Sequence, residues 1–330
     1  MRCLIVLVLA IPTPLHAAQQ GAGDQSAAGP GIFVAVGYGG LRGWSLHGDR
    51  WAAERWSAKN EDDDNIIFSI AYRAGVFVAA GGGASKGFVL RSVDGKAWAG
   101  TAAERHRICQ VIALDDRFVA TGEDTFLIST DGATWTAGGA SRPVSTSVPG
   151  DGHYRRSAAA PDGVVVYAGD YSPSGPGRGR MGWIGSTKQG VTALTISTWP
   201  ADICGLVHGG KRFVACGVHG QVLASDDGTV WKEVLQTRDA HDDGALRYGN
   251  GAFWLSGRTS VHTSPDGVSW TSVANEPHLP RATSPDGVGV DCGWDGIEVS
   301  GDGRTWTRAE VPIDATGVSA VVWGIPQEAP

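Results

Sequence analysis

One heptad, Ser-x-Asp-Gly-x-x-Trp, occurs five times in the chain and constrains its fold more than any other feature. Its copies end at five tryptophans: Trp98, Trp135, Trp231, Trp270 and Trp306. A second phrase, of the type Phe-Val-Ala-x-Gly, recurs seven times and ends at Gly37, Gly81, Gly122, Gly169, Gly217, Gly257 and Gly293. Recurrence at a spacing of roughly 40 residues is typical of repeat architectures, so the units should share one local fold.

Each unit contains four short apolar runs separated by turn residues, which predicts four antiparallel strands. The 49 glycines and 13 tryptophans suit a chain of tight turns and packed sheets. Seven units of this length close radially, so we predict an all-β, seven-bladed β-propeller over residues 31–324. The first unit lacks a first strand, and residues 317–324 form a spare one. We therefore expect the C-terminal strand to complete blade one and close the ring, leaving a tail over residues 325–330.

The heptad itself predicts a turn between two strands. Its aspartate can accept hydrogen bonds from backbone N–H groups two residues on, and its glycine can adopt a positive φ. Its tryptophan can pack against the neighbouring blade. Five equivalent carboxylates spaced around a rim do not converge on one substrate. We therefore assign a structural role to ten residues: Asp94, Trp98, Asp131, Trp135, Asp227, Trp231, Asp266, Trp270, Asp302 and Trp306.

At this point the chain resembles a known group, because the heptad is similar to the Asp-box or BNR repeat, although one residue shorter. Together with the Phe-Val-Ala-x-Gly phrase, it is similar to secreted bacterial propellers of the YCF48-like kind over about residues 31–324. The resemblance implies that the heptad turns join the third and fourth strands, away from the ligand-binding face. Sialidases of the same superfamily carry Arg-Ile-Pro near the first blade and a Tyr–Glu nucleophile pair. The sequence contains no Arg-Ile-Pro, so the resemblance does not extend to sialidase activity.

Residues 1–18 are predicted to be a signal peptide, with Arg2 followed by an apolar run and a small-residue site at Ala17 and Ala18. The alternative is a buried N-terminal strand. Residues 19–30 are predicted to be a flexible lead-in. The mature protein is therefore expected to be secreted or periplasmic, with no transmembrane segment. The formal net charge of -7 argues against nucleic acid as a partner.

Two cysteines, Cys204 and Cys216, flank a short hairpin turn at equal distances. A three-residue hairpin loop at Gly209–Lys211 would place them opposite each other, at a separation that suits a disulfide. We therefore predict a Cys204–Cys216 bridge. Cys109 and Cys292 occupy the matching positions in blades three and seven and are expected to be buried thiols.

Candidate binding residues lie on the loops at the channel face, which are the least repetitive parts of the chain. Histidines and charged groups precede several first strands, and a long loop in blade four carries two arginines. Such groups could bind an anion, three of the imidazoles could ligate a metal, or all could be solvated loop side chains. We predict no metal site and no cofactor. The candidate set is His106, Arg107, His153, Tyr154, Arg155, Arg156, Tyr171, Arg178, Arg180, His241, Asp242 and Asp243.

These features favour an exported, monomeric and non-enzymatic propeller that binds a protein, peptide or glycan on its channel face. An assembly factor of the YCF48 type is a special case, and it would carry an arginine patch on blades three and four. The alternative is a glycoside hydrolase, which needs two carboxyl groups about 5–9.5 Å apart. Its candidate carboxylates are Glu104, Asp202, Asp242 and Asp243. We assign no catalytic residue.

Overall fold

The computed structural model describes thirteen segments of the chain. They are residues 30–57, 63–83, 86–104, 107–122, 125–137, 153–162, 164–171, 181–186, 197–199, 203–239, 245–257, 260–273 and 279–327. The predicted signal peptide (1–18) and nearly all of the predicted lead-in (19–30) lie outside these residues, as does the end of the predicted tail.

The strands form four-stranded antiparallel sheets, which we number along the chain. Sheet 1 contains β28 (Val318–Gly324), β1 (Ile32–Gly37), β2 (Leu41–Ser45) and β3 (Ala52–Glu54). Sheet 2 contains β4 (Ile67–Arg73), β5 (Val76–Gly83), β6 (Lys86–Ser92) and β7 (Ala99–Glu104). Sheet 3 contains β8 (Ile108–Ala113), β9 (Phe118–Gly122), β10 (Thr125–Ser129) and β11 (Thr136–Ala137).

The remaining sheets repeat this meander order. Sheet 4 contains β12 (His153–Ala159), β13 (Val165–Tyr171), β14 (Met181–Ser186) and β15 (Ser197–Trp199). Sheet 5 contains β16 (Ile203–Gly209), β17 (Arg212–Gly217), β18 (Gln221–Ser225) and β19 (Lys232–Gln236). Sheet 6 contains β20 (Leu246–Gly249), β21 (Ala252–Ser256), β22 (Val261–Ser264) and β23 (Thr271–Val273). Sheet 7 contains β24 (Ala282–Thr283), β25 (Gly289–Gly293), β26 (Gly296–Ser300) and β27 (Thr307–Arg308). Two 3₁₀-helices, η1 (Tyr38–Gly40) and η2 (Asp63–Asn65), lie in connections.

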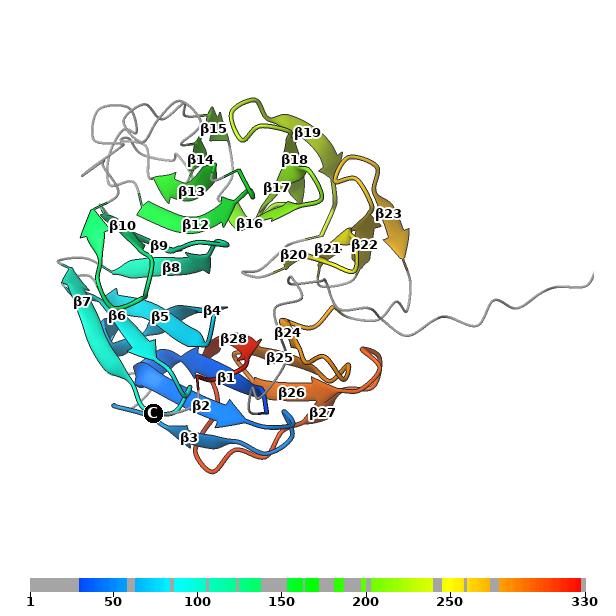
Figure 1. Ribbon diagram of the computed structural model, residues 1–330. Helices are drawn as coiled ribbons and strands as arrows, with labels where there is room; N and C mark the ends of the chain where they lie inside the picture. Colours follow the sequence, from blue (N-terminus) through cyan, green and yellow to red (C-terminus); the bar gives the residue numbers. More distant parts are fainter. Residues whose placement is uncertain are drawn as a thin grey trace, which may run out of the picture.

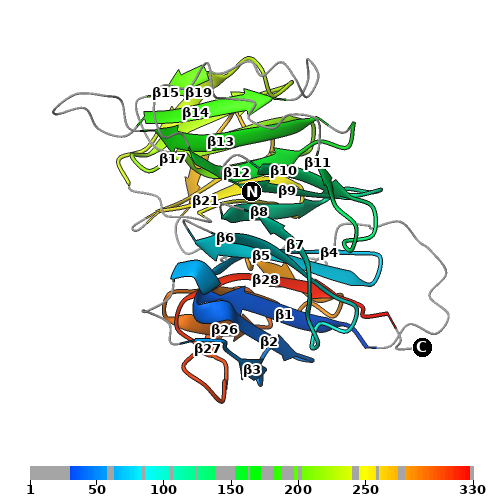
Figure 2. The same cartoon turned by 90° about the vertical axis from the view of Figure 1, so that its left-hand side faces the viewer.

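The sheets radiate from a central axis, with their first strands innermost (Figure 1), and they lie one above another when seen from the side (Figure 2). The prediction of an all-β propeller is confirmed.

Sheet 1 is assembled from both ends of the described chain. The last strand, β28, pairs antiparallel with β1, with Val34 opposite Val322 and Ile32 opposite Gly324. The chain then continues onto sheet 2, where the Tyr72 hydroxyl donates to the Ile325 carbonyl at 2.7 Å and the Gln327 N–H donates to the Val93 carbonyl at 2.9 Å. The C-terminal segment therefore joins sheet 1 to sheet 2.

The core lies between adjacent sheets, and the repeated Phe-Val-Ala phrase supplies it. Every residue of β1 and β5 is buried. The leading aromatic residue of the phrase is fully buried in five sheets, as Phe33, Phe77, Phe118, Phe213 and Phe253. These strands are apolar on both faces because each second strand packs between two neighbouring sheets.

The predicted hydrogen bonds of the heptad turn are present. In the copy at Ser129, the Asp131 carboxylate accepts the N–H groups of Ala133 and Thr134, both at 2.8 Å. The Ser129 hydroxyl oxygen accepts the N–H of Gly132, whose φ is +72°. Equivalent bonds occur at Asp94, Asp227, Asp266 and Asp302. Each of these carboxylates therefore accepts hydrogen bonds from the backbone of its own turn.

The tryptophan of the heptad closes the same turn. The Trp135 indole N–H donates to the Gly132 carbonyl at 3.1 Å and lies 3.2 Å from the Thr101 hydroxyl of sheet 2. The first, degenerate copy keeps this arrangement with His47 in the aspartate position, since the Trp51 indole donates to the Gly48 carbonyl at 2.7 Å. Trp51 is 5% exposed. The contact between tryptophan and glycine thus persists where the aspartate of the repeat is replaced.

These turns predict acid sensitivity. Backbone N–H bonds stabilise the charged forms of Asp131, Asp266 and Asp302 and lower the pKa of each to about 2. An unfolded aspartate titrates near a pKa of about 3.9, so the stabilisation is complete above that pH and is lost as the pH falls towards about 2. Urea midpoints should therefore fall between pH 4 and pH 2. Asp266→Asn retains an acceptor oxygen but no charge, so it should flatten this decline. An equal decline in the variant and the parent would contradict the assignment.

The Cys204–Cys216 bridge is not present in the structure, and the predicted register needs a correction. The four described cysteines are thiols, and the Cys204 and Cys216 sulfurs lie 3.6 Å apart, whereas a disulfide bond is about 2.05 Å long. Gly209 pairs with Arg212, so the hairpin turn has two residues rather than three, and the ladder places Gly205, rather than Cys204, opposite Cys216. A bulge between Ile203 and Gly205 then leaves Cys204 as the extra residue. Of the two remaining cysteines, Cys292 is buried as predicted, whereas Cys109 is only half-buried.

Candidate binding site

The structure describes only part of the predicted channel-face set. His106, Arg178, Arg180, His241, Asp242 and Asp243 lie outside the described residues, as does Asp202. His153, Tyr154, Arg155 and Arg156 belong to β12, and Tyr171 ends β13, but their side chains lie outside the description. The register brings His153 opposite Asp170, so these two strand ends meet at one edge of sheet 4. Arg107 is half-buried and directly precedes β8. The anion site and the arginine patch therefore stay predictions.

Three aromatic side chains of sheets 7 and 1 lie near the turns that join second and third strands. We call Trp294, Tyr38 and Trp56 the aromatic row. Trp294 lies in the β25–β26 turn and is 58% exposed, and Trp56 lies two residues after the end of β3 and is 46% exposed. Tyr38, in the β1–β2 turn, is half-buried and meets Trp294 edge to face, with ring centroids 5.3 Å apart. Large apolar side chains at this exposure are a common feature of interaction surfaces.

The glycines of the β1–β2 turn allow Trp56 to lie against the backbone. Gly39 and Gly40 have φ values of +65° and +70°, a region that side chains disfavour. A Cβ atom on Gly40 would lie 2.2 Å from the Trp56 ring. The Gly39 carbonyl accepts the N–H groups of Trp56 and Ser57 at 2.9 and 3.1 Å. Trp56 is therefore held in place by the turn that carries Tyr38.

A buried cation lies beneath Trp56. The Arg42 guanidinium carbon is 4.2 Å from the centroid of the Trp56 ring, and the Phe88 ring meets Trp56 edge to face at 5.7 Å. The Arg42 side chain is 7% exposed and pairs with the Glu54 carboxylate. Such cation–π packing fixes the orientation of the indole while leaving its outer face in solvent.

Arg55 ties the row to the segment that precedes β28. Its guanidinium donates to the carbonyls of Asp314 and Thr316 at 2.7 and 3.0 Å. Burial lowers the pKa of Arg55, and the nearby Asp314 carboxylate opposes this shift. Arg55 therefore stabilises the junction between sheets 7 and 1 at which the aromatic row lies. The positions of the three aromatic side chains are largely preformed.

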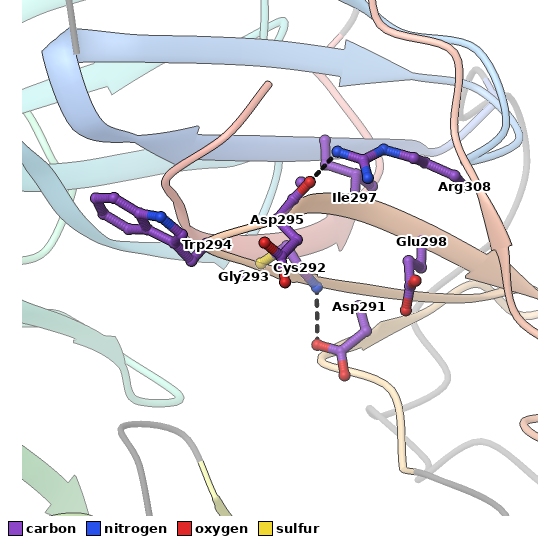
Figure 3. A pocket seen from close by; sticks show the side chains of 9 residues that line it. Asp291, Cys292, Gly293, Trp294, Asp295, Ile297, Glu298 and Arg308 are labelled. Atoms are coloured by element: carbon purple, nitrogen blue, oxygen red, sulfur yellow. Dashed lines mark hydrogen bonds between the residues drawn. The ribbon is translucent and has the colours of Figure 1, made fainter. Parts of the chain in front are cut away.

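A cavity of about 180 Å³ lies beside Trp294, at the β25–β26 hairpin (Figure 3). It is lined by exposed Asp295, Glu298 and Arg308 and, deeper, by Asp291 and Cys292. The Arg308 guanidinium donates to the Asp295 carbonyl. Burial raises the pKa of the Cys292 thiol to about 11, so this thiol is not a nucleophile near neutral pH. The cavity can accept a polar side chain of a partner next to the exposed indole.

The heptad turns lie at the opposite edge of each sheet from the aromatic row. In an antiparallel meander, the turn between strands two and three and the turn between strands three and four lie at opposite ends. The row belongs to the first kind, and the heptads belong to the second.

Sequence reasoning missed the aromatic row because it concentrated on the loops before first strands. A signal was present: Tyr38 and Trp294 each directly follow the last glycine of a repeated phrase, Gly37 and Gly293. Trp56 and Trp294 are also tryptophans outside the heptad.

Two negative findings apply to the described residues. Within these segments, no group of three or more His, Cys, Asp or Glu side chains is arranged to hold a metal ion. No helix in this part of the chain is long and apolar enough to cross a membrane.

The comparisons with known proteins agree with the fold. The structure of YCF48 bound to a D1 peptide matches with a TM-score of 0.53 at 16% identity, covering 86% of this chain and 89% of that one. The nidogen/laminin complex (9% identity, 90% and 99% covered) and BamB from Moraxella catarrhalis (14%, 90% and 92%) both match with a TM-score of 0.48. No protein-family model matches the sequence, and neither does any curated protein. The molecule thus belongs, by fold, to the β-propellers.

Proposed function

We propose that this chain is an exported, non-enzymatic propeller that binds a protein or peptide partner at the edge carrying the aromatic row. The observation that carries the proposal is the pair of exposed indoles: Trp294, which packs against Tyr38, and Trp56, which packs on the turn that carries Tyr38. Tryptophan and tyrosine are enriched among the residues that dominate binding energy at interfaces. They lose little conformational freedom on binding, and here packing already fixes them.

The proposal also covers the closure of the ring, the type of repeat, export and the oligomeric state. The seven sheets are seven blades of one closed ring, with β28 as the closing strand, which the β1–β28 pairing supports. The heptads are short Asp-box repeats, which their turn hydrogen bonds support. Residues 1–18 direct export, and the mature protein is a monomer.

The peptide character of the partner draws support from the YCF48 structure, because a propeller of similar fold is bound there to a peptide. A glycan is the alternative ligand, since exposed aromatic faces also stack against sugar rings. The glycoside hydrolase alternative depends on Asp202, Asp242 and Asp243, outside the described residues, and on Glu104 at the end of β7.

The test uses two named probes, a displayed library of random peptides and a glycan array. Peptides selected on the intact protein should lose binding by about tenfold or more in the Trp56→Ala and Trp294→Ala variants, as expected for interface anchors. Val230→Ser and Val268→Ser are the matched controls, because these valines are 65% and 41% exposed in heptad turns at the opposite edge. These two changes should leave binding unaltered.

Three outcomes would contradict the proposal. One is that selected peptides bind the tryptophan variants as well as the parent. Another is that the valine variants lose binding equally. The third is that only the glycan array yields a ligand, which would replace the peptide by a sugar at this edge.

A further inference from the structure

Two buried thiols lie within reach of each other in sheet 5. Cys204, on β16, is 3% exposed, and Cys216, on β17, is fully buried. Their sulfur atoms are 3.6 Å apart, and the Cys204 thiol also lies 3.5 Å from the Cys216 carbonyl oxygen. Closing this gap to a covalent bond needs a movement of about 1.5 Å, which side-chain rotation can supply.

A bulge and a glycine bring these sulfurs together. Cys204 is the extra residue of the bulge, since Ile203 pairs with Gly217 and Gly205 pairs with Cys216. A Cβ atom on Gly205 would lie 2.7 Å from the Cys216 sulfur and 2.9 Å from the Leu246 Cβ. The missing side chain at position 205 therefore leaves the space in which the two thiols meet.

Sheet 3 shows that the bulge alone does not bring two cysteine sulfurs together. Its strands carry the same bulge, with Cys109 as the extra residue, but Gln110 and Thr121 take the places of Gly205 and Cys216. Cys292 is the last but one residue of β25, the second strand of sheet 7, at the position that matches Cys216. Cys109 and Cys292 are thus natural controls within one chain.

We infer that Cys204 and Cys216 are an oxidation site, which closes as a disulfide while the chain folds. The oxidant is a small or protein-borne disulfide. One thiolate attacks a sulfur of the oxidant, forming a mixed disulfide and releasing one thiolate of the oxidant. The second cysteine thiolate then attacks the sulfur of the first cysteine in the mixed disulfide, forms the Cys204–Cys216 bond and releases the second thiolate of the oxidant. The two electrons and two protons of the cysteines end on the oxidant, as thiol–disulfide exchange requires.

The timing follows from the packing. Cys204 and Cys216 belong to a core cluster with Leu246, Phe253 and Leu255, which sheet 6 contributes. Once sheet 6 packs, a dissolved oxidant cannot reach the sulfurs, so the bond forms earlier. The same cover shields the finished bond from reductant in the native protein. This inference is independent of the proposed function and of the site of the aromatic row.

The experiment refolds the full chain with oxidised glutathione and then alkylates it before peptide mapping. We expect a Cys204–Cys216 linked peptide, a mass lower by two hydrogen atoms, and alkylation of Cys109 and Cys292. Dithiothreitol should open the bond only when urea is added. Against protein refolded with reductant, the oxidised form should melt about 5 °C higher, since the bond restricts the unfolded chain.

Three variants complete the experiment, two of them as controls. Cys109→Ser and Cys292→Ser should retain the linked peptide, whereas Gly205→Ala keeps both thiols but forces them apart, so the yield of the link should fall several-fold. Full alkylation of Cys204 and Cys216 after oxidative refolding would overturn the inference. So would a link from either residue to Cys109 or Cys292.

Discussion

Truncation after Gly317, which removes β28, is expected to abolish the cooperative unfolding transition of the whole protein. Without β28, strand β1 loses one of its two ladder partners although all six of its residues are buried. Exposing the cluster residues Val318 and Val321 alone costs about 3–6 kcal/mol. Each buried backbone group left unpaired adds about 1–3 kcal/mol. Together these losses reach the roughly 5–15 kcal/mol that stabilises a folded protein. Circular dichroism during thermal melting is the measurement.

Two milder truncations serve as controls for this prediction. Ending the chain at Gln327 keeps every described contact and should melt like the parent. Ending it at Gly324 removes the Tyr72–Ile325 and Gln327–Val93 hydrogen bonds and the bond from the Gln327 side chain to the Ala74 carbonyl, so it should cost about 1–3 kcal/mol and stay cooperative. A soluble, sharply melting protein that ends at Gly317 would show that β28 does not hold the fold together.

The propeller could be predicted from the sequence because its stabilising residues are periodic. Phe33, Phe77, Phe118, Phe213 and Phe253 each occupy the same place in a repeated phrase and the same buried place in a sheet. The heptad turns are equally local, since Asp131 bonds to residues two and three positions along the chain. Local geometry repeated many times leaves few topologies open.

The cysteine register could not be obtained in this way. Counting outward from the turn assumed a three-residue loop, whereas Gly209 pairs with Arg212 across a two-residue turn, which shifts the pairing by one residue. The letters Gly209, Gly210 and Lys211 are compatible with either turn length, so they do not reveal the register.

The candidate site was missed for a related reason. Tyr38 and Trp294 lie far apart in sequence, and their contact depends on sheets 7 and 1 being neighbours. Trp56 reaches the row only because Gly40 has no side chain. Contacts between units of a repeat depend on non-repeated residues, so periodicity cannot locate them.

The second large effect is expected at Asp291, which neutralises two arginines at the junction of sheets 6, 7 and 1. Its carboxylate accepts from Arg281 at 2.9 Å and from Arg247 at 3.1 Å, while Arg281 also donates to the Ser319 carbonyl of β28. Asp291 is 9% exposed. Burial lowers the pKa of Arg247, and the charge of Asp291 opposes this shift. Asp291→Asn keeps the shape but removes a buried carboxylate charge that both guanidinium groups contact, which should cost about 3–5 kcal/mol.

Urea unfolding measures this loss, and an exposed ion pair provides the matched control. Asp116 pairs with Arg117 on the surface, with side chains 61% and 44% exposed, so Asp116→Asn should leave the urea midpoint almost unchanged. Both changes remove one carboxylate charge, and the contrast reports the burial of Asp291 and its contact with two arginines instead of one. Similar urea midpoints for the two variants would mean that water reaches Asp291 freely. In that case the two arginines would not need its charge, and the junction would be held by β28 and its backbone ladder instead.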